Sequence, residues 1–286
     1  DSIYGDLGED TVDAGEGDNV VYTFSGNDEV SAGDGNDLIN TADGDEIIDA
    51  GDGDNTIYGG LGSETITAGS GADLVDGRDT ASGAASEDTV HIVDVGGGNN
   101  IVYTDNGPDE VTSLEGDDQI TTYAGADWIS TGGGDDLVTS TEGNDTISTS
   151  DGHDTVSSGA GDDEITTGSG EDNIDAGDDD DIVYAQSDDD VVNAGDGDDR
   201  VYASSGNDVV YAGGGDDLVV GDDGDDYIQG EGGDDILWGG GETYSHTYFD
   251  LSDSVMFTFP PDFEDAEALN PTGYTPPWMT PIILAG

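Results

Sequence analysis

A nine-residue period runs through most of this chain, and it limits the folds that the chain can adopt. The repeat frame covers residues 5–76 and 95–238 without a slip. One long unit (77–91) and a spacer (92–94) separate the two runs, which brings the total to 25 units. A pattern that stays in phase over so many units excludes random Gly/Asp-rich low complexity and indicates a stacked repeat architecture.

Three positions of the unit carry the pattern. The eighth is Val, Ile or Leu in all 25 units, the sixth is Asp in 20, and the fourth is Gly in 22. We expect residues seven to nine to form a short strand with only the middle side chain facing inward. Glycine at position four allows positive φ and a close approach of carbonyl groups to an ion, and Asp at position six offers a hard oxygen ligand. One unit cannot bury its apolar side chain alone, so neighbouring units have to stack.

The acidity of the chain points to bound cations. Asp and Glu number 70 against two basic residues, Arg78 and Arg200, and the net charge is −68. Strongly acidic chains poor in apolar residues are usually disordered, but here hydrophobic residues make up 32% and recur at a fixed spacing. We therefore interpret the acids as ligands whose charge is neutralised by cations in the fold.

The units resemble the RTX, or haemolysin-type, calcium-binding nonapeptide G-G-x-G-x-D-x-U-x. Residues 213–219 (GGGDDLV) and 232–237 (GGDDIL) are close matches, and the similarity covers about four-fifths of the chain. The resemblance implies an all-β fold, a right-handed parallel β-roll in which two nine-residue units form each coil and the coils build two parallel sheets. It also implies many Ca²⁺ ions between turns on the same side, held by turn carbonyls and by position-six Asp of units one coil apart.

Carried onto this sequence, the resemblance implies metal ligands at the position-six aspartates. One edge would hold Asp109, Asp127, Asp145, Asp163, Asp181, Asp199, Asp217 and Asp235, and the other Asp118, Asp136, Asp154, Asp172, Asp190, Asp208 and Asp226. The remaining predicted ligands are Asp10, Asp28, Asp37, Asp73 and Asp88. In the less regular N-terminal third, Glu46 and Glu64 are one methylene too long. Asn19 and Asn55 lack charge, so these four sites are expected to be weaker or empty.

The charge supports this interpretation. If the long unit keeps the turns on their sides, 25 units give 23 pairs of turns one coil apart. One Ca²⁺ in each pair would contribute +46 and bring the net charge from −68 to about −22, which a soluble protein tolerates.

The irregular stretch 77–94 is interpreted as a surface loop that leaves the stack and returns. Arg78 either occupies the place of a missing calcium ion or, as we favour, is a solvated loop residue. In the repeat frame His91 falls at position nine and His153 at position five, so both are expected to be exposed.

Hydroxyl and aromatic residues recur at the outward-facing position nine. The hydroxyl residues are Thr112, Thr121, Ser130, Thr139, Ser148, Ser157 and Thr166, and position one is Ser or Thr in eight consecutive units of the same region. β-Propensity and solubility explain them; a resemblance to the Thr-rich faces of some ice-binding solenoids is the less favoured alternative. Elsewhere position nine carries Tyr22, Tyr58, Tyr103, Tyr184, Tyr202, Tyr211 and Trp238. We expect these aromatic residues to stack as cross-strand neighbours, with glycan binding as the less favoured alternative.

The repeats end at Trp238, so residues 1–238 are predicted to form the roll and 239–286 an aromatic, Pro-rich cap and tail. An open coil end would expose apolar side chains and unpaired strand edges, and the alternating residues 255–259 predict a last strand. The tail is alternatively a type I secretion signal, or a segment that resembles the region upstream of a hedgehog/intein-type autoprocessing domain. Because the chain begins within a repeat, we interpret it as a fragment of a longer protein.

Several classes of function are disfavoured. The chain has no cysteine, no apolar stretch long enough for a membrane span and no basic patch for nucleic acid. Its three His are scattered and form no catalytic constellation, so no enzyme is predicted. We expect a secreted bacterial module, structural or adhesive, that folds on binding calcium outside the cell after type I secretion. The alternatives are a protomer of an extracellular filament or matrix that associates end to end, and the accessory repeat region of a larger secreted enzyme or toxin.

Overall fold

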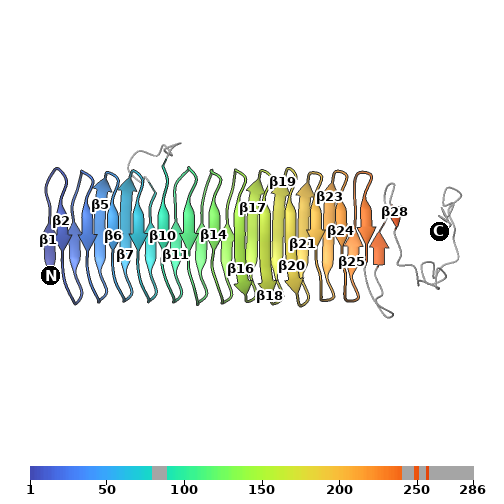
Figure 1. Cartoon of the computed structure of the whole chain (residues 1–286), viewed down its shortest axis with the longest axis horizontal. Helices are drawn as coiled ribbons and strands as arrows, with labels where there is room; N and C mark the ends of the chain where they lie inside the picture. The colour runs from blue at the N-terminus through green and yellow to red at the C-terminus, as the bar shows by residue number, and fades with distance from the viewer. Residues whose placement is uncertain (79–88, 240–247, 251–255, 258–286) are drawn as a thin grey trace, which may run out of the picture.

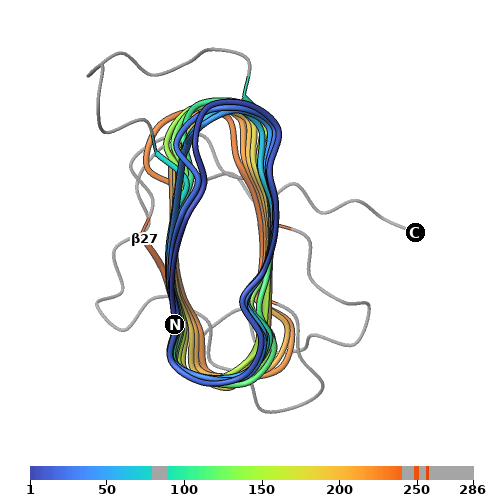
Figure 2. The same ribbon diagram turned by 90° about the vertical axis from the view of Figure 1, so that its left-hand side faces the viewer.

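The structure is a computed structural model, and it describes residues 1–78, 89–239, 248–250 and 256–257. Over these residues the chain forms 28 short strands and no helix. Figure 1 shows the strands side by side along one long axis, and Figure 2 shows the coils end-on as a flattened loop with two long walls.

Each wall is a sheet of 14 strands. The first sheet contains β1 (Ser2–Tyr4), β3 (Val20–Tyr22), β5 (Leu38–Asp43), β7 (Thr56–Leu61), β9 (Leu74–Asp76), β11 (Ile101–Tyr103), β13 (Gln119–Thr121), β15 (Leu137–Thr139), β17 (Thr155–Ala160), β19 (Asn173–Asp178), β21 (Val191–Asp196), β23 (Val209–Gly214), β25 (Tyr227–Gln229) and β27 (Tyr248–Asp250). The second contains β2 (Thr11–Asp13), β4 (Glu29–Ser31), β6 (Ile47–Asp49), β8 (Thr65–Thr67), β10 (Ile92–Asp94), β12 (Glu110–Thr112), β14 (Trp128–Ser130), β16 (Thr146–Asp151), β18 (Glu164–Ser169), β20 (Ile182–Ser187), β22 (Arg200–Tyr202), β24 (Leu218–Val220), β26 (Ile236–Trp238) and β28 (Met256–Phe257).

The register aligns equivalent repeat positions. Val21 lies opposite Ile39 in the first sheet, and Val30 lies opposite Ile48 in the second, so each residue faces its equivalent two repeat units later. All the strand pairs are parallel, because each coil visits the two walls once and returns to the first wall one strand further on. The predicted all-β parallel roll with two units in each coil is confirmed.

The core is one thin apolar layer between the walls. Position-eight side chains such as Ile39, Ile57 and Ile120 are fully buried. Position one also faces inward, as Ala32 and Ala50 show. This follows from the period of two along a strand, in which position eight points in, position nine out and position one in again. The space there is small, and the position carries Ala, Gly, Ser or Thr in every described unit except that of Val95.

The long unit keeps the register but not in the predicted frame. Ile66 of β8 lies opposite Val93 of β10, three repeat lengths later in the chain instead of two, so the turns do stay on their sides. Val93 is buried and Val90 is 41% exposed, so Val93 holds position eight and the frame that gave this place to Val90 is wrong. His91 consequently holds position six and is only 1% exposed. The prediction of an exposed His91 is therefore wrong as well.

Two further predictions, for His153 and for one pair of outer aromatic residues, are confirmed. His153 is exposed, as expected. Tyr184 and Tyr202, on neighbouring strands, stack with their ring centroids 5.1 Å apart, which confirms cross-strand stacking for that pair.

Most of the predicted C-terminal cap lies outside the described residues. The strand expected within 255–259 is present as β28, which pairs with β26, while β27 pairs with β25. The boundary between roll and cap stays a prediction. Among the residues that the structure covers, no helix is long and apolar enough to cross a membrane.

Candidate metal centre

The position-six aspartates form a column at each end of the flattened loop, just before the strands. In one column the backbone N–H of Asp109 donates to Oδ1 of Asp127 at 2.9 Å, and the N–H of Asp127 donates to Oδ1 of Asp145 at 2.8 Å. In the other column the N–H of Asp118 donates to Oδ1 of Asp136 at 2.8 Å. Each carboxylate is thus held by a backbone amide one coil earlier, which leaves its second oxygen for another partner.

That second oxygen is buried and has no hydrogen-bond donor in most of these residues. The position-six aspartates that the structure describes are at most 3% exposed, except Asp10. The unpartnered Oδ2 atoms belong to Asp28, Asp37, Asp73, Asp109, Asp118, Asp127, Asp136, Asp154, Asp163, Asp172, Asp181, Asp190, Asp199, Asp208, Asp217 and Asp226. Native proteins rarely leave a buried polar atom without a partner, because its desolvation costs free energy that nothing offsets. Such a series of orphaned carboxylate oxygens indicates a missing class of ligand, and a cation fits it.

The electrostatics of the columns agree with a cation. Burial, together with the carboxylates one coil away on either side, raises the pKa of Asp181 and of Asp190 to about 8. Burial likewise raises the pKa of Asp136 to about 7. Without a cation these carboxyl groups would hold protons near neutral pH, so a divalent ion and a proton compete for the same oxygens.

The turn backbone supplies further oxygens. The clearest view of them comes from Asn19, which replaces Asp at position six and points its Nδ2 at three carbonyl oxygens, those of Gly15, Gly17 and Ala32. In most Asp turns a carboxylate oxygen without a hydrogen-bond donor takes the place of this amide nitrogen. The described residues contain no cluster of three or more His, Cys, Asp or Glu side chains suited to a metal. The carboxylate oxygens and these main-chain carbonyls together offer an all-oxygen set, which suits Ca²⁺.

The N-terminal third departs from this arrangement. Glu46, Glu64 and His91 hold position six in successive coils and are each 1% exposed, and neither carboxyl oxygen of Glu46 has a hydrogen-bond partner. Burial raises the pKa of Glu46 to about 8 and that of Glu64 to about 9, and it lowers the pKa of His91. Without a cation these three groups would be neutral near pH 7, as the aspartates with raised pKa values would be. Asp88, predicted as a ligand at this turn, lies outside the described residues, and His91 holds the position assigned to it.

Buried hydroxyls next to the carboxylates are a feature that the sequence reasoning missed. The eight position-one residues are Thr104, Ser113, Thr122, Thr131, Ser140, Thr149, Ser158 and Thr167, and none is more than 3% exposed. Ser140 donates its hydroxyl to Oδ2 of Asp145, and Ser158 donates to the carbonyl of Ala176 at 2.6 Å. The period-two alternation along each strand was the signal that could have placed them inside.

Arg78 takes neither of the two roles considered for it. Its guanidinium makes two hydrogen bonds of 2.8 Å to the carboxylate of Asp76, one to the hydroxyl of Tyr123 at 3.3 Å, and lies 4.2 Å from the ring centroid of Tyr103. Arg78 is thus anchored on the outer wall at the base of the long unit. It is not a freely solvated residue, and it does not lie in a position-six column.

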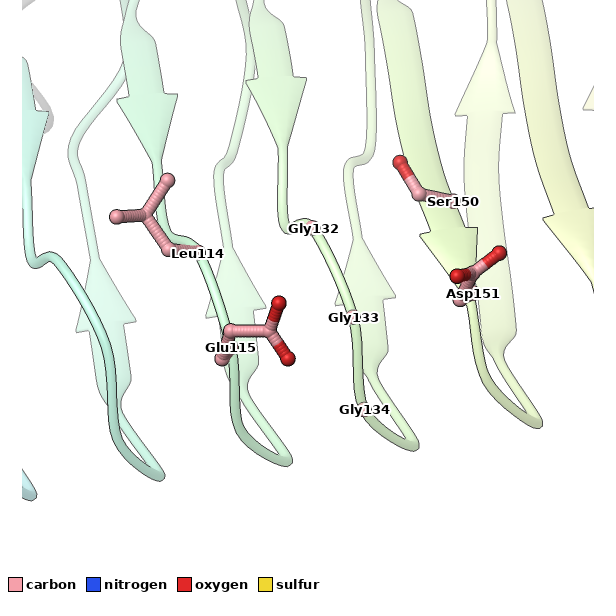
Figure 3. A pocket seen from close by; sticks show the side chains of 7 residues that line it. All are labelled: Leu114, Glu115, Gly132, Gly133, Gly134, Ser150 and Asp151. Atoms are coloured by element: carbon pink, nitrogen blue, oxygen red, sulfur yellow. The ribbon is translucent and has the colours of Figure 1, made fainter.

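A hollow lies at one edge of the roll, on the turns that lead to Asp118, Asp136 and Asp154. Figure 3 shows Leu114 and Glu115 on one turn, Ser150 and Asp151 on another, and the glycines 132–134 between them. The missing side chains of the glycines create the hollow. Its two acidic groups are exposed and converge on no orphaned buried atom, so we assign it no chemistry.

Comparison with known protein families identifies the repeat that forms the columns. A family model described as RTX calcium-binding nonapeptide repeat (4 copies) matches residues 4–39 and 40–75, and then overlapping stretches from 103 to 243. Among curated proteins no significant match to this chain is found. The family match includes nothing on a hedgehog/intein-type domain, which stays a prediction.

Proposed function

Because this chain belongs to the RTX calcium-binding nonapeptide-repeat family, we propose that it is a β-roll module that folds as it binds Ca²⁺ outside the cell and acts there as a structural or adhesive element. Only repeats are recognised in it, and no catalytic family. Calcium binding is a property of the repeat. Its use in an extracellular rod is our proposal.

The observation that carries the proposal is the pair of buried carboxylate columns. Position-six side chains one coil apart lie at about the inter-strand spacing of ~4.8 Å. Two unit charges at that distance repel by about 3–4 kcal/mol at an effective dielectric constant near 20. The repulsion recurs along both columns, for example from Asp163 to Asp181 and on to Asp199. The ionised columns therefore need a counter-charge, and in this proposal bound Ca²⁺ supplies it.

We propose the aspartates of the two regular columns as the ligands, Asp109 to Asp235 on one edge and Asp118 to Asp226 on the other. Asp10, Asp28, Asp37 and Asp73 extend the same two columns toward the N-terminus. In most of these residues Oδ1 accepts a backbone N–H that orients the carboxylate, and Oδ2, which has no hydrogen-bond donor, is presented to the ion with the turn carbonyls. Oδ2 of Asp10 accepts from the N–H of Asp6, and Oδ2 of Asp145 accepts from the hydroxyl of Ser140. Ca²⁺ neutralises the column and ties successive turns together, so binding and folding become one event.

The net charge of the chain also supports secretion in an unfolded state. A chain with net charge −68 and no bound cation resists compaction, and an uncompacted chain suits passage through a type I channel. Calcium sites of extracellular modules have dissociation constants of about 10⁻⁴–10⁻³ M, so the chain would stay open inside the cell and close outside.

A calcium titration followed by far-ultraviolet circular dichroism tests the proposal. We expect an unfolded spectrum in chelator at neutral pH, a cooperative rise of β signal with Ca²⁺, and little response to Mg²⁺, which demands near-octahedral geometry. A chain that is already rich in β structure in chelator at pH 7.5 would contradict coupled folding. A β signal that rises equally with Mg²⁺ would contradict a calcium-specific ligand set.

A further inference from the structure

Two turns on one edge of the roll are closed by side-chain amides. Nδ2 of Asn19 donates hydrogen bonds to the carbonyl oxygens of Gly15 at 2.8 Å, Gly17 at 2.5 Å and Ala32 at 3.1 Å. Gly15 and Gly17 belong to the same turn as Asn19, and Ala32 opens the turn one coil later. Asn19 is only 2% exposed, so this amide is part of the interior.

Asn55 repeats the arrangement two coils further on. Its Nδ2 donates to the carbonyl oxygens of Gly51, Gly53 and Ala68, each at 3.1 Å. These carbonyls hold the same repeat positions as those around Asn19, namely two, four and one. The same three oxygens converge on one point in two separate turns, so the convergence belongs to the backbone and not to one side chain.

An aspartate in this place presents an acceptor where the Asn side chain presents donors. The Asn amide presents N–H donors to the carbonyls, whereas the carboxylate of Asp37, which lies between the two Asn turns, presents Oδ2 without a donor. Acceptors that face acceptors require a cation between them. Acceptors that face an amide are already satisfied. The N–O distances of the amide are within about half an ångström of usual Ca²⁺–oxygen distances, so the amide fills the space an ion would need.

We propose that the amides of Asn19 and Asn55 stand in the cation's place, so that these two turns are hydrogen-bonded shut and bind no calcium. This inference rests on the proposed function, because it takes the Asp turns to be calcium sites. Asn100 donates to the carbonyl of Gly98 alone among these three oxygens, and it is therefore left out of the pair.

Two kinds of turn alternate along this edge. Position six reads Asn19, Asp37, Asn55 and Asp73 in successive coils, so turns closed by an amide alternate with turns that would take an ion. The backbone N–H of Asn19 still donates to Oδ1 of Asp37 at 2.7 Å, and that of Asp37 to Oδ1 of Asn55 at 3.0 Å. The ladder between coils is therefore continuous, and two of its turns keep their contacts without calcium.

Native mass spectrometry of the full chain at saturating Ca²⁺, which counts bound ions, tests the inference. The variants are N19D, N55D and the double variant. N36D is the matched control, because it adds the same charge at an exposed residue outside the ring of carbonyls. A reverse variant, D37N, installs an amide in an Asp turn.

We expect N19D and N55D each to bind one more ion than the natural chain, the double variant two more, N36D the same number and D37N one fewer. Equal counts for N19D, N55D and N36D would overturn the inference while leaving the calcium function intact. A natural chain that binds no calcium at all would instead overturn the proposed function. If D37N fails to fold, the gain-of-ion variants alone decide the question.

Discussion

Glu64 and His91 lie against each other inside the stack, with Oε2 of Glu64 at Nδ1 of His91. They are three repeat lengths apart in the chain but only one coil apart in space, because the long unit adds one repeat length to the usual offset of two. Neither side chain is more than 1% exposed. Where the regular columns carry aspartates, this pair places a carboxylic acid beside an imidazole, and both are neutral when the carboxyl keeps its proton.

The Glu64 carboxyl gives the first prediction, which concerns pH. Burial raises its folded-state pKa from 4.5 to about 9. Protonation therefore favours the folded chain, and this contribution is complete below about pH 4.5 and is lost as the pH rises toward 9. Glu64→Gln keeps the shape and removes the ionisation, so we expect the variant to gain stability over the natural chain as the pH rises, by up to about 1.4 kcal/mol per pH unit.

Thermal unfolding of both proteins at pH 4.5 and pH 8, with calcium in excess, measures this difference. The control is Glu164→Gln, which removes an exposed carboxylate on a strand surface. A difference for Glu64→Gln that is the same at both pH values would show that Glu64 ionises normally in the fold.

The aspartate columns give a second pH prediction, for the chain without calcium. The pKa of Asp181 and Asp190 is raised from 3.8 to about 8 by burial and by neighbouring carboxylates. Their protons stabilise the fold fully below about pH 4, and the effect fades as the pH rises through 8. Calcium-free protein is therefore expected to gain β structure on acidification from pH 8 to pH 4.5, as circular dichroism would measure. With calcium present the trend reverses, since protons then displace the ion. A calcium-free chain that stays equally unfolded at both pH values would argue against these raised pKa values.

Much of the fold could be predicted from the sequence because every nine-residue unit repeats the same pattern of residues. One aliphatic residue per unit, held in phase, is enough to predict position eight of every strand. The position-eight residue of the long unit was harder to predict, because Val90 and Val93 are both apolar. The sequence allows the irregularity to fall either before or after Val90. The stretch 77–94 is as long as two whole repeat units, and a frame that runs through it unbroken puts Val93 at position eight.

The candidate site was predictable in its side chains but not in its backbone. A position-six Asp suggests a ligand from its chemistry alone. The converging carbonyls around Asn19 depend on how successive turns stack, which only the three-dimensional fold shows. The absence of charge at Asn19 predicted a weak site, but it did not predict that the amide would close the turn.

A third prediction compares a buried carboxylate with its exposed neighbour. Asp217 is 1% exposed and its Oδ2 has no partner, whereas Asp216 next to it is exposed. Asp217→Ala should remove one calcium ion, raise the calcium concentration at the folding midpoint, and cost about 3 kcal/mol, since the turn loses its ion and an anchor for the N–H of Asp199. Asp216→Ala should leave the ion count unchanged and cost less than about 1 kcal/mol. Ion counting and calcium titration of the two variants measure this, and equal losses in both would mean that position six is not the ligand position.

The last prediction concerns two adjacent glycines, and it tests whether the turn carbonyls are as closely stacked as the ligand set requires. Gly98 has a φ of 128°, and a Cβ there would overlap the carbonyl oxygen of Gly71 one coil earlier. At Gly97 a Cβ would come no closer than 3.7 Å to any neighbour, the carbonyl oxygen of Glu115. Gly98→Ala therefore has to shift a carbonyl of the neighbouring turn as well as adopt a strained φ, and we expect a loss of at least about 2 kcal/mol.

Gly97→Ala should be within about 0.5 kcal/mol of the natural chain, because the surface is open there. Calcium-dependent unfolding of the two variants by urea gives both values. Because the two substitutions add the same methyl group one residue apart, composition and charge cancel in the comparison, and the difference reports the packing of successive turns. If Gly98→Ala were as stable as Gly97→Ala, the coils would be further apart than this stacking requires, and carbonyls from neighbouring turns would be too distant to share an ion.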